Sequence, residues 1–116
     1  MPRPLTYRAP ADPAGAFLPW LDELRNANGV YVIRRTDNKQ ALYVGESHTS
    51  RLAKTVKRHF YPWPDDPERE HHTYQKGRVE IAIRLTPPAA APGAQSRLIR
   101  RLDPRDNGNG WGEEPF

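Results

Sequence analysis

The segment from Gly29 to Phe60, GVYVIRRTDNKQALYVGESHTSRLAKTVKRHF, constrains the fold more than any other part of the chain. Two stretches, Val30–Ile33 and Ala41–Val44, are rich in β-branched and aromatic residues. The polar link between them carries Asp37 and Asn38. β-Branched and aromatic residues favour strands, and Asp and Asn favour turns. The segment therefore predicts a β-hairpin that is followed directly by a basic helix.

A turn centred on Asp37 predicts that Tyr31 and Tyr43 face each other across the two strands. Because side chains alternate along a strand, the opposite face is then aliphatic and is expected to face the core; it carries Val30, Val32, Leu42 and Val44. The tyrosine face is expected to be exposed, with small neighbours that leave room for a ligand: Gly29, Ala41 and Gly45. A one-residue bulge would break this pairing.

The composition limits the class of protein. A chain of 116 residues supports one domain with a modest core. Eighteen Lys and Arg against fourteen Asp and Glu give a net charge of +4, which favours a polyanionic partner. The absence of cysteine excludes disulfides and thiolate metal sites. No apolar run is long enough to span a membrane and no signal peptide is recognisable, so a cytoplasmic protein is expected.

The other periodic segments surround the hairpin. Residues 1–13 are expected to form an extended arm, and residues 108–116 a flexible, Gly-rich tail. Between them, residues 14–107 are expected to form the domain. Within it, helical spacing predicts helices over Ala14–Arg25, over Arg51–Phe60 and from Gly93 or Ala94 to Leu102. Strict alternation predicts a strand over Arg78–Leu85, with Glu80 and Arg84 on the tyrosine face.

The motifs GVY and YVG, the Arg-rich helix ending in Arg-His-Phe, and the ending Gln-x-x-Leu-Ile…Pro…Asn together resemble the GIY-YIG nuclease superfamily. The resemblance covers roughly Gly29 to Asn107, which is most of the chain. It implies an α+β fold, in which a small three-stranded antiparallel sheet (29–35, 41–45 and 78–85) is flanked by about three helices. It also implies a metal-dependent DNA endonuclease that hydrolyses phosphodiester bonds.

The resemblance assigns catalytic roles by position. Tyr31 would be the general base that takes a proton from water, and Tyr43 would support it and contact phosphate. Arg51 would brace the scissile phosphate, with Arg58 as a competing candidate because the spacing to the YVG motif is imperfect. His59 would assist the tyrosine or the substrate. We expect Arg51 and Gln95 to lie near the two tyrosines.

Gln95 stands where the family places the glutamate that binds a single Mg²⁺ or Mn²⁺ ion. An amide oxygen supplies no charge, and Mg²⁺ prefers carboxylates. Three explanations stay open. Another carboxylate, Glu80 or Glu46, holds the metal; or the protein is a DNA-binding relative with impaired catalysis; or glutamine has been introduced to inactivate a nuclease.

Four basic residues are predicted to contact the nucleic-acid backbone: Lys54, Lys57, Arg58 and Arg97. Asn107 would hydrogen-bond the active-site loop or the substrate, or is simply a turn residue. The pair His71–His72 is more typical of a surface than of a zinc site, because no second pair accompanies it.

Three classes of function follow. The first is a DNA endonuclease, the second a non-catalytic nucleic-acid-binding module derived from one, and the third a protein-interaction adaptor that keeps only the fold. DNA specificity would come from a partner protein, from an oligomer or from the 61–77 loop.

Overall fold

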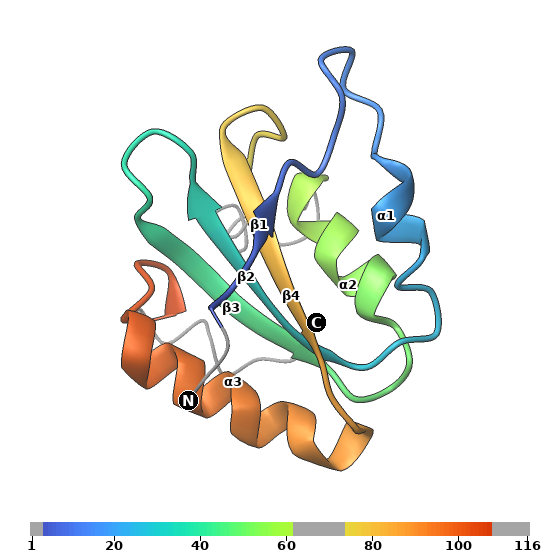
Figure 1. Cartoon of the computed structure of the whole chain (residues 1–116), viewed down its shortest axis with the longest axis vertical. Coiled ribbons are helices and arrows are strands. Elements are labelled where there is room, and N and C mark those ends of the chain that lie inside the picture. The colour runs from blue at the N-terminus through green and yellow to red at the C-terminus, as the bar shows by residue number, and fades with distance from the viewer. Residues whose placement is uncertain (1–3, 62–73, 108–116) are drawn as a thin grey trace.

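The computed structural model describes residues 4–61 and 74–107. The pair His71–His72, which is not expected to bind zinc, and the expected 108–116 tail lie outside the described residues. The predicted fold class is confirmed: helices pack on a small antiparallel sheet (Figure 1). The sheet has four strands in the order β1-β4-β2-β3. Their bounds are β1 (Tyr7–Arg8), β2 (Gly29–Arg35), β3 (Ala41–Ser47) and β4 (Val79–Leu85).

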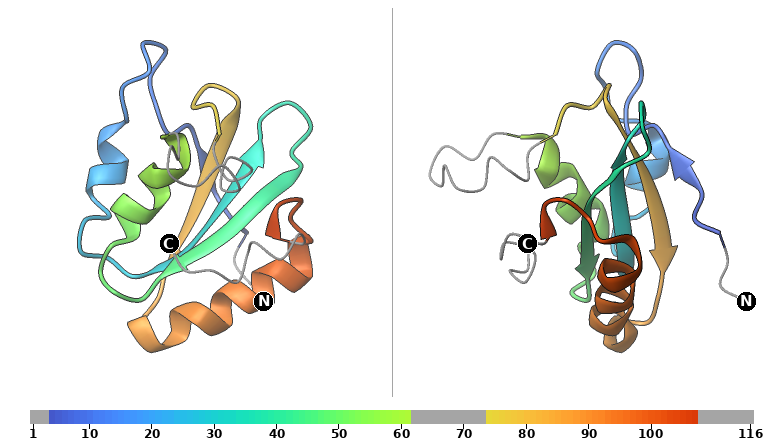
Figure 2. Two further views of the ribbon diagram at one scale, coloured as in Figure 1. Left: turned by 180° about the vertical axis from the view of Figure 1, so that it is seen from behind. Right: turned by 90° about the vertical axis from the view of Figure 1, so that its left-hand side faces the viewer.

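The fourth strand comes from the segment expected to be an arm without regular structure. Tyr7 pairs with Ala82 and Arg8 with Ile81, so β1 covers part of the outer edge of β4. The two-residue strand carries no periodic pattern that sequence analysis could detect. In Figure 2 the right-hand view shows this N-terminal segment on one side of the sheet and α2 on the other.

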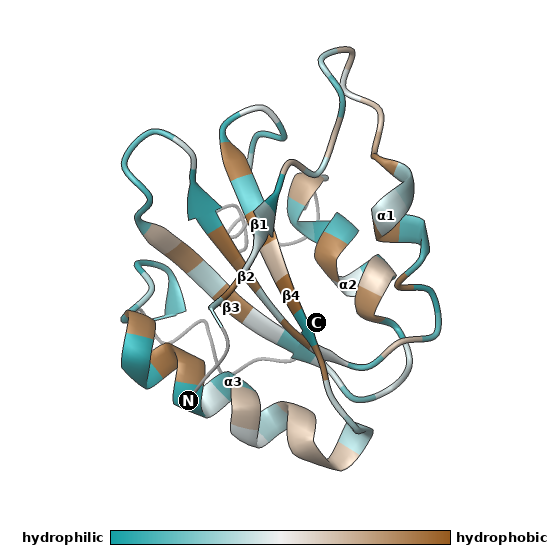
Figure 3. Cartoon of the chain, viewed as in Figure 1, coloured by the Kyte–Doolittle hydropathy of each residue, from teal (hydrophilic) through white to brown (hydrophobic). Residues whose placement is uncertain are grey.

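The hairpin forms as predicted, but its register differs. Tyr31 pairs with Gly45 and Ile33 with Tyr43, and a register shift follows Ile33. The predicted pairing of Tyr31 with Tyr43 is therefore wrong, because the turn is not centred on Asp37 and a bulge intervenes. The two tyrosines still share a face, with ring centroids 6.2 Å apart. Figure 3 shows the hydrophilic loop that joins the more hydrophobic strands.

Each face of the sheet carries its own core. The tyrosine face packs Tyr31 and Ile33 with Leu52 and Val56 of α2 (Leu52–Lys57), and it also holds Leu42. The other face, which we call the valine face, is covered by α3 (Ala91–Leu102); its core consists of Val30, Val32, Val44, Ala82, Ala94 and Leu98. The helices α2 and α3 therefore lie on opposite faces.

Two predicted placements need correction on this basis. The bulge moves Leu42 from the valine face to the tyrosine face. The aliphatic side chains Val79 and Ile81 of β4 also join the tyrosine-face core, opposite to the expectation. Since neighbours along a strand alternate, Glu80 and Arg84 lie on the valine side and not beside the tyrosines.

The helices differ from the predicted ones mainly at their ends. The predicted helix over 14–25 shrinks to α1 (Pro19–Asp22), because turns around Gly15 and Asn26, both with positive φ, bound it. The helix predicted over 51–60 divides into α2 and a 3-10 helix, Arg58–Phe60. No helix among residues 4–61 and 74–107 is long and apolar enough to cross a membrane.

Candidate active site

The tyrosine face brings together three of the four residues predicted to be catalytic. The hydroxyl oxygen of Tyr31, on β2, lies 2.8 Å from Nε2 of His59, in the 3-10 helix after α2. The Tyr43 ring, on β3, lies 4.7 Å from the His59 ring. The helix α2 packs Leu52 and Val56 onto this face, and so it delivers His59 to the phenol.

This cluster is buried, whereas the tyrosine face was expected to be exposed. Tyr31 and His59 are 0% exposed and Tyr43 is 1% exposed. The reason is packing: α2 and the aliphatic face of β4 close over the rings and make them the centre of a core. Sequence alternation identified the shared face correctly but could not tell which face the helix covers.

Burial changes what Tyr31 can do chemically. The pKa of Tyr31 is raised well above its ordinary value, first by burial and then by the neighbouring Tyr43, Tyr74 and Glu46; the charge of Arg58 opposes this. The phenol therefore keeps its proton at neutral pH. It can donate a hydrogen bond to a neutral His59, but it is not a ready general base in this conformation.

Two residues that sequence reasoning missed extend the cluster. The Tyr74 hydroxyl donates a hydrogen bond of 2.6 Å to Oδ2 of Asp106, and its ring stacks on His59 with centroids 5.8 Å apart. Arg105 binds the same carboxylate through Nε at 2.8 Å. Burial and the Asp106 carboxylate raise the pKa of Tyr74. No local spacing links positions 74 and 106, so only the fold reveals the pair.

The raised tyrosine pKa values predict a loss of stability at alkaline pH. Above about pH 10 the unfolded chain releases phenol protons that the folded chain keeps, so the free energy of unfolding falls as pH rises. Each such tyrosine contributes a slope of about 1.4 kcal/mol per pH unit. Tyr31→Phe is expected to reduce the alkaline slope by that amount, measured by denaturant unfolding at several pH values. An unchanged slope would mean that Tyr31 titrates normally.

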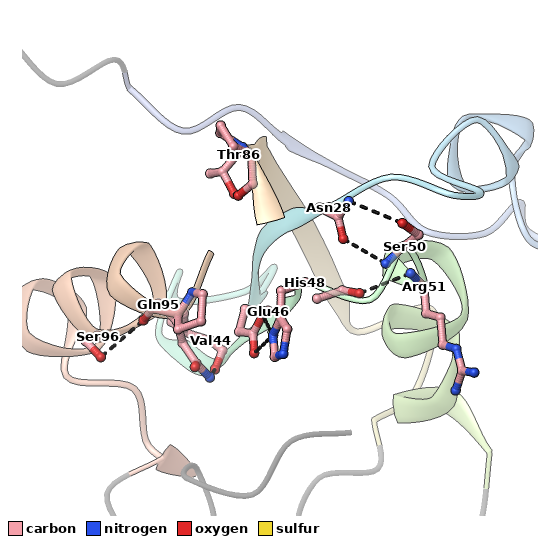
Figure 4. Close-up of polar contacts among 12 residues, drawn as sticks. Asn28, Val44, Glu46, His48, Ser50, Arg51, Thr86, Gln95 and Ser96 are labelled. Carbon is pink, nitrogen blue, oxygen red and sulfur yellow. Dashed lines mark hydrogen bonds and ion pairs between the residues drawn. The ribbon is translucent and has the colours of Figure 1, made fainter. Parts of the chain in front are cut away.

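The predicted metal position, Gln95, reaches the edge strand β3 from α3. Its amide Nε2 donates to the Val44 carbonyl oxygen at 3.2 Å. On β3, the Tyr31 ring lies against Gly45, and a Cβ at that position would overlap the Cζ and Oη atoms of Tyr31. Glu46 is close enough to raise the pKa of Tyr31. The segment from Val44 to Glu46 therefore adjoins Gln95 through Val44 and the Tyr31 ring through Gly45. Figure 4 shows Gln95 beside Val44, with Glu46 further along the strand.

The residues at this position do not fit a tightly held Mg²⁺ or Mn²⁺ ion. Gln95 offers one neutral oxygen while its amide nitrogen is bound to Val44. The Glu46 carboxylate accepts contacts of 3.0 Å from Nδ1 of His48. Across the described ranges, no group of three or more His, Asp or Glu side chains is placed to hold a metal. We therefore derive no catalytic step through a metal.

The alternative metal ligand Glu80 lies elsewhere. It forms ion pairs with Arg34 and Lys39. Glu80 pairs with Arg34 across the sheet, whereas Glu46 pairs with Val30, four residues further along β2. At about 3.3 Å per residue this separates the two carboxyl-bearing positions by roughly 13 Å along the strand. Of the two candidates, Glu46 is the one whose charge acts on the pKa of Tyr31.

The predicted phosphate-binding arginine, Arg51, does not approach Gln95. It precedes α2, where its backbone N–H donates to the Ser47 hydroxyl at 3.1 Å, and its exposed guanidinium points away from Gln95 and Glu46 (Figure 4). Arg58 instead is the cation whose charge acts on Tyr31. This charge, and the position of Arg58 next to His59 in the 3-10 helix, favour Arg58 over Arg51 as the arginine beside the tyrosines.

The predicted nucleic-acid contacts do not form one surface. Lys54 and Arg58 are exposed on the α2 side, while Arg97 is exposed on α3, which covers the opposite face. Lys57 forms an ion pair with Asp22. Only the α2 side therefore combines basic residues with the tyrosine cluster.

The side chain of Asn107 binds the backbone of β3. Its side-chain Oδ1 accepts a hydrogen bond from the Val44 N–H at 2.7 Å, and its Nδ2 donates to the Val44 carbonyl at 3.0 Å. The N–H groups of Arg105 and Asp106 donate to Ala41 and Leu42. The C-terminal segment thereby satisfies backbone groups on the free edge of β3. Asn107 is buried and orders the strand segment that carries the YVG motif.

Neither a scan of the chain against protein-family models nor a search of curated proteins finds a match. The assignment to the GIY-YIG superfamily rests on the sequence motifs and stays a prediction.

Proposed function

We propose that this chain is a DNA-binding domain of the GIY-YIG type in which phosphodiester hydrolysis is weak or absent. The observation that carries the proposal is the contact between the hydroxyl of Tyr31 and the imidazole of His59, beside an exposed basic stripe on α2. It is the pairing expected of an active site of this type, and it is found next to side chains suited to phosphate.

The basic stripe consists of Arg51, Lys54 and Arg58. These positions follow the spacing i, i+3 and i+7, so they share one side of a helical segment. All three are exposed. Lys and Arg arranged in this way neutralise phosphates along a nucleic-acid backbone. Arg58 connects the stripe with the cluster, since its charge reaches Tyr31.

Two features argue against efficient hydrolysis. Position 95 carries an amide where a carboxylate is expected, and a neutral ligand holds a divalent cation poorly. The Tyr31 phenol is buried and keeps its proton, so it does not offer a ready base to an attacking water. The two features together favour slow or absent hydrolysis.

An active endonuclease is the second candidate, and one observation favours it. Glu46 is close enough to raise the pKa of Tyr31 and contacts Nδ1 of His48 at 3.0 Å, so a carboxylate and an imidazole already lie together at the end of β3. In this alternative Glu46 replaces the carboxylate that position 95 lacks, and the protein cuts DNA without any substitution.

DNA affinity is expected to fall steeply with salt, because bound cationic side chains release condensed counterions. With about three phosphate contacts, affinity should drop roughly 40-fold between about 50 and 200 mM salt. The double change Arg51→Gln with Lys54→Gln should reduce the slope of log affinity against log salt by about two. Fluorescence anisotropy with a labelled duplex measures both quantities.

The matched control is Arg97→Gln with Arg100→Gln, which removes the same charge from the exposed side of α3 on the opposite face. It should leave the slope close to that of the unchanged chain. A wild-type affinity that does not respond to salt would reject DNA binding and favour the adaptor function. Equal effects of the two double variants would show that binding is not directed to the α2 side.

A further inference from the structure

A cavity of about 430 Å³ lies at the turn end of the β2–β3 hairpin. Three segments that are distant in sequence form its walls: the end of β2, the stretch that leads into β4, and the C-terminal segment after α3. The lining residues that matter here are Arg35, Leu42, Tyr74, Arg78, Val79 and Arg105.

Three arginines line this cavity, and two of them have carboxylate partners. Arg35 binds Asp37, itself part of the lining, through Nε at 2.9 Å and Nη2 at 2.6 Å. Arg105 binds Asp106 in the same two-pronged manner. Arg78 makes no ion pair with any residue of 4–61 or 74–107. The cavity therefore has an excess of positive charge at Arg78.

The backbone holds Arg78 in place before any ligand arrives. Its carbonyl oxygen accepts hydrogen bonds from the N–H and the hydroxyl of Thr36, and its N–H donates to Gln75. Its side chain is left to project from a fixed position. Arg35 keeps unused N–H donors on Nη1, because Asp37 occupies only Nε and Nη2. The cavity lining thus carries two guanidinium groups with free donors of the kind that bind a tetrahedral oxyanion.

The floor of the cavity is apolar and belongs to the tyrosine face. Leu42, Tyr74 and Val79 are all members of the tyrosine-face core. The Tyr74 N–H also donates to the His59 carbonyl at 2.7 Å, so the cavity adjoins the end of the helical segment that carries the basic stripe. Its size suits a ligand with an apolar part and a charged part, as in a nucleotide unit.

We propose that this cavity binds a phosphate of the nucleic acid, as a second backbone contact beyond the basic stripe on α2. The inference rests on the proposed DNA-binding function, since the cavity would enlarge the DNA-binding surface on the α2 side. Phosphate could also come from a free nucleotide, which would use the same guanidinium groups. The ligand we assign is the polymer, because the cavity floor and α2 belong to the same face of the sheet. The two are also joined by the hydrogen bond from Tyr74 to His59, the residue that follows Arg58 of the stripe.

The test compares Arg78→Gln with Arg100→Gln, which removes the same charge from α3 on the opposite face. The side chain of Arg78 is exposed and its hydrogen bonds involve the backbone, so Arg78→Gln should fold normally. Arg78→Gln is expected to weaken duplex binding roughly 3- to 10-fold and to lower the salt slope by about one. Arg100→Gln should leave the slope unchanged. Calorimetric titration of the wild type and Arg78→Gln with thymidine monophosphate measures whether the cavity binds a free nucleotide.

Three other results are possible, and each contradicts a different part of the proposal. If both variants bind the salt-sensitive duplex like the wild type, the cavity is not a contact, while the proposed function stands. If only the thymidine monophosphate titration depends on Arg78, the ligand is a free nucleotide and not the polymer. If the unchanged chain shows no salt-dependent binding to DNA, the proposed function fails and the polymeric ligand fails with it.

Discussion

Gln95→Glu is expected to raise the nicking of supercoiled DNA in Mg²⁺ or Mn²⁺ by at least about 10²-fold, from a weak or undetectable starting level. The amide at position 95 contributes no charge, whereas a carboxylate there would lie beside Val44 on β3. Glu46 follows two residues later, about 7 Å along the strand, and already contacts His48. The substitution would therefore complete a donor set of two carboxylates and one imidazole, which suits a divalent cation.

Two controls make this result specific. Ser96→Glu places the same charge at the next, exposed position of α3 and should not increase cleavage. Adding Tyr31→Phe to Gln95→Glu should remove the gain, because Tyr31 is the general base that the motif resemblance predicts. Asn107 still donates to the Val44 carbonyl when the amide of Gln95 is lost, so the fold should survive.

The remaining outcomes separate the two candidate functions. Efficient cleavage by the unchanged chain would show that position 95 is not a missing ligand, and Glu46 would be the first residue to replace. If Gln95→Glu stays inert while salt-dependent DNA binding persists, the domain is a binding module and the nuclease alternative is rejected.

The elements with strong periodicity could be predicted from the sequence because their patterns depend on neighbours along the chain. The hairpin, the strand that contains Ile81 and the helix that contains Leu98 all follow this rule. The register could not be predicted, since it depends on a bulge after Ile33 that no residue type specifies. The edge strand β1 could not be predicted either, because two residues carry no period.

Part of the candidate site could also be predicted from the sequence, and part could not. The motif resemblance predicted that Tyr31, Tyr43 and His59 act together, and the structure places their rings in contact. It did not predict their burial, because which face a helix covers is a property of the packed molecule. The pairing of Tyr74 with Asp106 spans 32 positions of sequence and depends on where the C-terminal segment returns to β3.

The second large effect is expected at Gly45, where Gly45→Ala should cost more than about 3 kcal/mol of the free energy of unfolding. The added Cβ would overlap Cζ and Oη of Tyr31, a ring that is 0% exposed and hydrogen-bonded to His59. Relief requires either the ring or the backbone of β3 to move, and both lie in a packed core. For a domain of this size such a loss lowers the melting temperature by more than about 10 °C.

The matched control is Gly77→Ala, since a Cβ at Gly77 meets no atom within 4 Å; it should change stability by less than about 0.5 kcal/mol. A double-mutant cycle then tests the cause. Tyr31→Leu removes the overlapping atoms, so adding Gly45→Ala to Tyr31→Leu should cost much less than adding it to the wild type. If Gly45→Ala is as mild as Gly77→Ala, the Tyr31 ring does not lie over Gly45. The YVG glycine would then have no packing reason.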